Sequence, residues 1–163
     1  MASLKTIALD AMGGDHGPEV VVPGAALSLD RQPALRFIFF GQQSRIEAVL
    51  QQYPALAIKS RVVHTDLVIA MDEKPSQALR HGKGSSMWLP LEAVKAGDAD
   101  AAVSAGNTGA LMAIAKLVLR PMAGRSMPEP TSAPRPTSLP FMRSWAPRWR
   151  ALYFISNGHW SGS

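Results

Sequence analysis

The chain has 163 residues, of which 47% are hydrophobic and 18% are charged. This length and composition suit one folded domain and exclude a disordered chain. The absence of cysteine excludes disulfides and thiolate catalysis and fits a reducing cytoplasm. No apolar run approaches the roughly 18 residues that span a bilayer, and the first residues lead into a strand without the apolar segment of a signal peptide. We therefore expect a soluble, cytoplasmic protein.

The net charge of +5 is concentrated toward the C-terminal end. Residues 1–120 hold 12 Lys or Arg against 11 Asp or Glu, a balance of +1, whereas residues 121–163 hold 5 Arg and one acidic residue, Glu129. Because the basic residues belong mainly to the tail and not to a folded basic face, we expect no nucleic-acid partner.

Residues 5–18 predict a strand, a glycine-rich loop and the start of a helix. The strand covers 5–9 and is followed at once by Asp10, and Pro18 suits the first position of the helix. The loop between them contains Gly13, Gly14 and Gly17 together with Asp15 and His16. Glycine lets backbone approach a ligand and a helix N-terminus offers free N–H groups, so this loop could hold an anion. The alternative is a tight turn whose glycines serve geometry alone; the spacing matches neither nucleotide-binding fingerprint.

Helices and strands alternate over the next 50 residues or so. We expect a helix over 19–29, a strand over 35–41, a helix over 44–52 that Ser44 caps and Pro54 stops, and a strand over 58–63. The candidate buried residues of the first helix are Val20, Val21, Ala25, Leu27 and Leu29. Such alternation indicates βαβ units, a mostly parallel sheet and helices on both faces. Ligands of such sheets bind beyond the carboxyl ends of the strands, where Asp10 and the glycine loop fall.

Residues 71–87 combine cations and hydroxyls beside short helical turns. The cations are Lys74, Arg80 and Lys83; Ser76 is a predicted N-cap, and Ser85 and Ser86 open a helix that runs from 86 to 96 and ends at Gly97. These groups suit a phosphate or a phosphopantetheine linkage. A solvated, capped surface loop is the alternative.

Residues 101–119 repeat the architecture of the first stretch. We predict a buried strand over 101–105, a polar loop over 106–109 and an apolar helix over 110–119. Ser104, Asn107 and Thr108 supply neutral donors where an oxyanion or phosphate could sit. The alternative is that Asn107 and Thr108 merely cap the helix.

Other residues point to no metal or covalent chemistry. His64, His81 and His159 show no metal-ligand spacing, and no serine lies in a nucleophile-elbow pattern. We expect no metal, no cofactor and no covalent acyl-enzyme.

Three segments resemble the bacterial PlsX-type phosphate acyltransferases, the fatty acyl-phosphate synthases of phospholipid biosynthesis. They are Asp-Ala-Met-Gly-Gly-Asp-His-Gly-Pro from Asp10, Met-Asp-Glu-Lys-Pro-Ser-Gln-Ala-Leu-Arg from Met71 with the following Lys83 and Ser-Ser-Met, and Ala-Asp-Ala-Ala-Val-Ser-Ala-Gly-Asn-Thr-Gly-Ala-Leu-Met from Ala99. All three occur in the family's order within residues 5–120. The resemblance implies an α/β fold with three layers, helix, mostly parallel sheet and helix, like that of isopropylmalate dehydrogenase and phosphotransacetylase. Residues 1–123 would be the N-terminal part of that domain.

The resemblance also implies a reaction, the transfer of a fatty acyl group from acyl-acyl carrier protein to inorganic phosphate to give acyl phosphate. Such a site must hold a phosphate dianion, stabilise an oxyanion and release a thiolate. A catalytic role, in orienting groups, holding the oxyanion or moving protons, is expected of Asp10, Asp15, His16 and Asn107. Substrate or phosphate binding is expected of Gly13, Gly14, Lys74, Arg80, Lys83, Ser85, Ser86, Ser104, Gly106 and Thr108, with the three cations serving phosphate or the acidic carrier protein. The alternatives are an inactive N-terminal fragment and another phosphate-binding α/β protein.

Members of the family are dimeric and loosely associated with the membrane. The resemblance therefore implies a cytoplasmic location with peripheral association at the inner face of the membrane. We do not carry the homodimer over to this chain, because the dimer could depend on the second half of the family sequence.

From about Gly124 the sequence changes character. Seven of the 13 prolines fall in residues 121–147 and three of the four tryptophans follow residue 144, with no helical or strand period. Family members continue here with another apolar strand and a second half. We hypothesise that residues 124–163 are a disordered tail read from a shifted or mispredicted frame. Translation of the source DNA past codon 124 in the other frames tests this, and failure to recover a βαβ-like continuation contradicts it. The alternative is an Arg/Trp segment for a membrane surface or partner.

Overall fold

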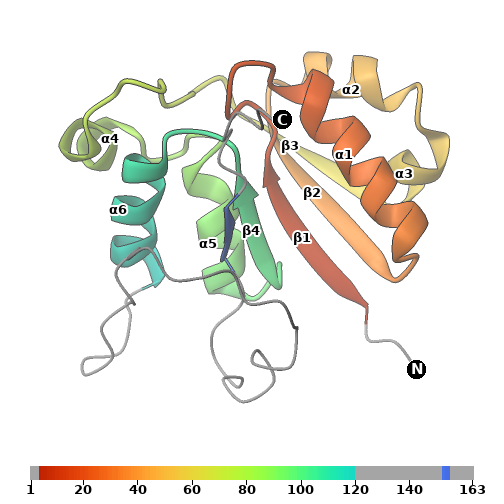
Figure 1. The fold of residues 1–163 in the computed structure, drawn as a ribbon. Coiled ribbons are helices and arrows are strands. Elements are labelled where there is room, and N and C mark those ends of the chain that lie inside the picture. The colour runs from red at the N-terminus through yellow and green to blue at the C-terminus, as the bar shows by residue number, and fades with distance from the viewer. Residues whose placement is uncertain (1–3, 120–151, 155–163) are drawn as a thin grey trace, which may run out of the picture.

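A computed structural model describes residues 4–119 and a short strand at 152–154. In these parts of the chain five parallel strands form one sheet (Figure 1). The strands are β1 (Lys5–Asp10), β2 (Leu35–Gly41), β3 (Ser60–His64), β4 (Ala101–Ser104) and β5 (Leu152–Phe154), and their spatial order is β3-β2-β1-β4-β5. The predicted α/β fold with a parallel sheet is confirmed.

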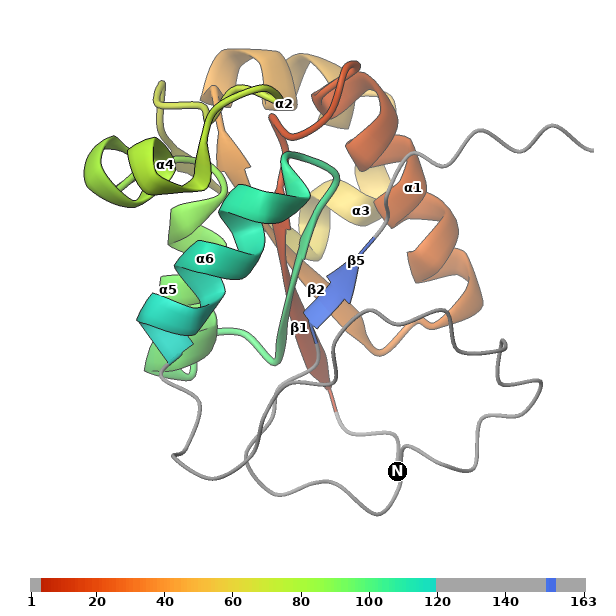
Figure 2. The same ribbon diagram turned by 60° about the vertical axis from the view of Figure 1, so that its left-hand side comes forward.

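Helices cover both faces of this sheet, as Figures 1 and 2 show. One face carries α1 (Pro18–Arg31), α2 (Gln43–Leu50) and α3 (Pro54–Ile58). The other carries α5 (Trp88–Ala96) and α6 (Thr108–Leu119), and α4 (Pro75–His81) packs against α6. The result is the expected three layers. No helix in the described part of the chain is long and apolar enough to cross a membrane.

The centre of the sheet explains the continuous apolar run in β2. Phe37 and Phe39 lie in the core beneath α1–α3, whereas Ile38 and Phe40 lie in the core beneath α5 and α6. Successive side chains of a strand point to opposite faces, so a strand with helices on both sides needs apolar residues at every position. Fully burying each of these side chains stabilises the fold by roughly 1.5–3 kcal/mol.

Helix α1 corrects two of the predicted core positions. Val20 and Leu27 are 58% and 62% exposed, whereas Val22, Ala25 and Leu29 are buried. The buried residues recur at i, i+3 and i+7, which is one stripe of an α-helix. Val20 and Leu27 fall outside this stripe.

Two predicted serine caps are also wrong. Helix α2 begins at Gln43, so Ser44 lies within its first turn, and the N–H of Gln43 donates to Nδ1 of His64 on β3 at 3.3 Å. Helix α4 begins at Pro75, so Ser76 is likewise inside the first turn. Proline's fixed φ favours the first helical position, which places the start one residue before Ser76.

The connection after α2 differs from the expected one. The helix ends at Leu50, and Pro54 opens α3. Ile58 closes α3, so β3 starts at Ser60, two residues later than predicted. The proline that we expected to stop one helix therefore serves as the first residue of the next.

Strand β5 belongs to the segment that we predicted to be a disordered tail. Its three residues pair with β4, with Ala102 opposite Leu152 and Ser104 opposite Phe154. The predicted boundary at 124 and the rest of the tail lie outside the described residues, so the prediction for them is untested.

Candidate functional site

The candidate site lies at β1, on whose two sides the chain adds successive strands in opposite directions. From β1 the chain proceeds through β2 to β3 on one side, and β4 is then added on the other side of β1. The loops that follow β1 and β4 therefore leave adjacent parallel strands at the same edge of the sheet (Figure 1). Such a switch point at the carboxyl ends of the strands is where ligands of open α/β sheets bind.

A hydrogen-bond chain joins these two loops through Asp10, the last residue of β1. The Ser104 hydroxyl donates to Oδ2 of Asp10 at 2.7 Å, and Oγ of Ser104 accepts the N–H of Gly106 at 3.0 Å. Oδ1 of Asp10 accepts the N–H of Met12 at 3.1 Å. Asp10 and Ser104 are both buried. The chain thus fixes the β1–α1 loop against the β4–α6 loop.

Gly13 closes over this hydrogen-bond chain. A Cβ at Gly13 would lie 2.6 Å from Oδ2 of Asp10 and 2.9 Å from the amide nitrogen of Gly106. The Asp10 side chain is buried and hydrogen-bonded to Ser104, and the Gly106 nitrogen is backbone, so neither atom moves aside easily for a side chain at Gly13. Gly14 has φ of +80° and faces the carbonyl oxygen of Ala105. These glycines are required by the close approach of the two loops, which is compatible with both interpretations of the sequence, a tight turn and an anion cradle.

Burial raises the pKa of the Asp10 carboxyl. Hydrogen bonds to the carboxylate from Ser104, and interactions with Ser86 and the backbone of Met12 and Gly13, offset part of the rise. Ser86 is 1% exposed, and its hydroxyl has no hydrogen-bond partner of good geometry in the described part of the chain. The site therefore contains a buried carboxyl group and one buried hydroxyl with unused bonding capacity.

Asn107 holds the β4–α6 loop in place and caps α6. Its Oδ1 accepts the N–H of Ala110 at 3.0 Å, and its Nδ2 donates to the carbonyl oxygen of Glu73 at 2.8 Å and to that of Ala70 at 3.3 Å. The capping alternative from the sequence is therefore correct for this side chain. The first-turn N–H groups of Thr108 and Gly109 have no partner within residues 4–119, and both residues are exposed.

Only part of the segment 71–87 lies close to the two loops. Lys74 is the N-cap residue of α4, and Pro75 lies against Gly109 at the start of α6, so Lys74 is beside the α6 N-terminus. Ser85 is buried and its Oγ accepts the N–H of Trp88, the first residue of α5, whereas the N-cap residue of that helix is Met87. Arg80 and Lys83 are exposed and form no ion pair within the described residues.

Asp15 and His16 are exposed on the β1–α1 loop, and neither forms a hydrogen bond with Asp10 or Ser104. Residues 4–119 contain no cluster of His, Asp or Glu that could hold a metal ion. Two backbone groups were not predicted from the sequence, the N–H of Met12 and that of Gly109. The second could have been found, because the first N–H groups of every helix lack partners within it.

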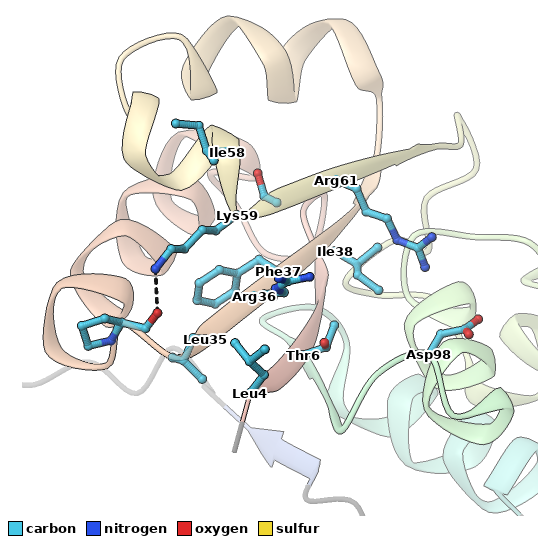
Figure 3. A pocket seen from close by; sticks show the side chains of 12 residues that line it. Leu4, Thr6, Leu35, Arg36, Phe37, Ile38, Ile58, Lys59, Arg61 and Asp98 are labelled. Atoms are coloured by element: carbon cyan, nitrogen blue, oxygen red, sulfur yellow. Dashed lines mark hydrogen bonds between the residues drawn. The ribbon is translucent and has the colours of Figure 1, made fainter. Parts of the chain in front are cut away.

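The cavity drawn in Figure 3 lies at the opposite edge of the sheet. It has a volume of about 520 Å³ and is lined at the amino ends of the strands by residues that include Thr6, Arg36, Ile38 and Arg61. None of the residues predicted to bind substrate lines this cavity. It is therefore separate from the loops described above.

Comparison with known proteins identifies the family. The model of the family described as "Fatty acid synthesis protein" matches residues 5–131, which include β1–β4, all six helices and both loops. The chain belongs to this family, that of the PlsX-type phosphate acyltransferases. The predicted resemblance is confirmed, and the match includes all three sequence segments on which it was based.

Individual relatives are phosphate acyltransferases. The chain is 59% identical to the one from Azorhizobium caulinodans and 60% identical to the one from Afipia carboxidovorans, in each case over 129 residues, or 78% of this chain. It is 61% identical to the one from Rhodopseudomonas palustris over 123 residues. These alignments cover 35–36% of the relatives, so the chain spans about a third of their length. The matched residues are an N-terminal portion of the family protein.

Proposed function

We propose that the β1–α1 and β4–α6 loops form the phosphate site of an acyltransferase that moves a fatty acyl group from acyl-acyl carrier protein to inorganic phosphate. The observation that carries this proposal is the contact between the two glycine loops at the switch point of the sheet. The sequence identity of the chain to phosphate acyltransferases and the family match over residues 5–131, which include both loops, support it.

The phosphate would be bound by backbone N–H groups. Those of Gly14, Thr108 and Gly109 have no partner within residues 4–119, and a helix N-terminus stabilises negative charge. The N–H of Gly106 is already bonded to Ser104, so in this state it does not serve the ligand. Lys74, the N-cap residue of α4, would neutralise phosphate at the start of α6, whereas Arg80 and Lys83, exposed farther along the same segment, would contact the acidic carrier protein.

The reaction forms one bond and breaks one. A phosphate oxygen attacks the thioester carbonyl carbon, the carbonyl oxygen carries the negative charge of the intermediate, and the carbon–sulfur bond then breaks to release the carrier thiolate, which takes up a proton. N–H groups directed at the site stabilise the developing oxyanion.

The experiment is to measure acyl-phosphate formation by the purified 163-residue chain from acyl-acyl carrier protein and phosphate, with a full-length relative as positive control. Turnover supports the proposal and places the catalytic groups within this chain. A folded chain that binds phosphate without turnover would be the inactive fragment. Tight binding of a nucleotide in preference to phosphate would contradict the proposal.

A further inference from the structure

The Asp10 carboxyl group is buried beside the proposed anion site without a counter-ion. The groups that contact it are all uncharged, namely the hydroxyls of Ser104 and Ser86 and the backbone of Met12 and Gly13. An ionised carboxylate here would repel any dianion bound by the neighbouring loops, because charge interactions are weakly screened in a protein interior.

Charged side chains on the surrounding elements do not neutralise Asp10. Within the described residues Glu19 on α1 pairs with Arg45, Glu92 on α5 accepts from the indole N–H of Trp88, and the β4–α6 loop has no charged residue. Other exposed charged or titratable residues include Asp15 and His16 on the β1–α1 loop, Lys74 before α4 and Lys83 before α5. None of them bonds to the Asp10 carboxylate.

The hydroxyl of Ser104 has no hydrogen to offer a ligand while Asp10 is ionised. A serine hydroxyl donates one hydrogen and accepts up to two. Here the hydrogen goes to Oδ2 of Asp10, and one lone pair accepts the N–H of Gly106. A proton on Asp10 would reverse the first of these bonds, since the carboxylic O–H could donate to the second lone pair of Ser104. The Ser104 hydrogen would then be free to turn toward the site.

We propose that Asp10 is a proton-linked positioning residue, which takes up one proton from solvent when a phosphate-like dianion binds and so releases the Ser104 hydroxyl to donate to that anion. No covalent bond forms or breaks in this step except the O–H bond on Asp10. The proposal rests on the proposed function, because it uses the same anion site. Burial of Asp10, which favours its neutral form, supports it.

Sulfate is the probe, because it remains a dianion over the pH range in which proteins are most stable, whereas phosphate titrates there itself. Calorimetric titration of the 163-residue chain with sulfate, in two buffers of different ionisation enthalpy, counts the protons taken up. We expect the uptake to rise toward one proton per sulfate as the pH increases through the pKa of Asp10 in the free chain. Above that pKa the affinity for sulfate should fall by up to about tenfold per pH unit.

The D10N variant tests the residue. The amide introduced by D10N can donate permanently to Oγ of Ser104, so we expect sulfate binding without proton uptake and with an affinity that does not change with pH. S104A should bind sulfate about tenfold or more weakly at low pH, since a hydrogen bond to a charged group is lost. H16Q is the control for the nearest histidine in the loop and should keep the proton uptake.

Four results overturn the proposal. The first is sulfate binding by the unmodified chain without proton uptake, and the second is proton uptake in D10N equal to that of the unmodified chain. Either result overturns the proposal but is consistent with the anion site. Absence of sulfate binding by a folded chain overturns both this proposal and the proposed function. Proton uptake that disappears in H16Q also overturns the proposal, because the proton then binds to His16. This test uses only the unmodified chain and H16Q, so it holds even if D10N does not fold.

Discussion

The two loops of the site are held in place by different means. The β1–α1 loop is fixed by the lack of side chains, because Gly13 lies against the Asp10 carboxylate where no Cβ fits. The β4–α6 loop is fixed by polar side chains, because Ser104 and Asn107 bond to groups on both sides of it. One loop therefore depends on close packing of backbone, and the other on hydrogen bonds that can be removed singly.

This difference predicts that substitutions in the two loops act through different physical effects. In the first loop an added methyl group at Gly13 should be costly. In the second loop the loss of the Asn107 amide should be costly. A methyl group added at Gly106 should cost little, because its nearest neighbour is a flexible side chain. Each prediction below tests one side of this comparison.

The largest effect is expected for Gly13→Ala. Its Cβ would lie 2.6 Å from the carboxylate of Asp10 and 2.9 Å from the nitrogen of Gly106, so the two loops must separate. We expect a loss of roughly 1–3 kcal/mol in the free energy of unfolding, the usual cost of overpacking. Urea denaturation measures it.

Gly24→Ala is the matched control, because the same methyl group is added to helix α1, which follows the loop. Nothing lies within 4 Å of a Cβ at Gly24, and alanine favours the helix by roughly 0.5–1 kcal/mol over glycine. We expect a gain in stability. Equal losses for the two variants would contradict the crowding at Gly13.

Asn107→Ala should cost about 1–2 kcal/mol, since it removes the N-cap of α6. It also removes both bonds to the segment before α4. Asn107→Asp is the comparison, because its carboxylate can still accept the N–H of Ala110 but cannot donate to Glu73 and Ala70. Hydrogen exchange should increase over 70–74 in both variants and at the start of α6 in the alanine variant alone. Unchanged exchange over 70–74 would show that the Nδ2 bonds do not hold that segment.

The fold was largely predictable because its signals are local. The run 37–40 in β2, the glycine that ends α5 and the apolar α6 each carry their own pattern in sequence. The errors arose where the start of a helix depends on a residue that is distant in sequence or on the helix's own first residue. Gln43 begins α2 with its N–H bonded to His64 on another strand, and Val20 faces solvent because the start of α1 sets which stripe is buried.

The site was predictable as loops but less so as contacts. The three sequence segments identified the loops, and glycine was expected where backbone comes close. The bond between Asp10 and Ser104 joins residues 94 positions apart, and no local pattern indicates it. The same holds for the bond from Asn107 to Glu73, which gives a predicted catalytic side chain a structural partner.

Asp10 links the two loops, and its titration should appear in stability. The raised pKa means that the folded state keeps the proton to a higher pH than the unfolded state, so stability is present at low pH and lost as pH rises through the folded pKa. D10N cannot titrate. We therefore expect the stability of D10N relative to the unmodified chain to increase from about pH 4 upward, by about 1.4 kcal/mol for each unit by which the pKa is raised. Urea denaturation over a pH series without added anions measures this, and a constant difference would contradict it.

The smallest effect is expected for Gly106→Ala, in the loop that depends on hydrogen bonds. Its Cβ would lie 2.7 Å from Cε of Met87, the flexible end of a long side chain, and 3.2 Å from Oγ of Ser104. Methionine can adjust its rotamers, so we expect a loss of less than about 1 kcal/mol. Met87→Leu, which removes the terminal methyl at similar volume, should reduce this loss further when the two substitutions are combined. If the loss is as large as for Gly13→Ala and is unchanged in the double variant, the β4–α6 loop is also fixed by backbone crowding, and the difference between the two loops does not hold.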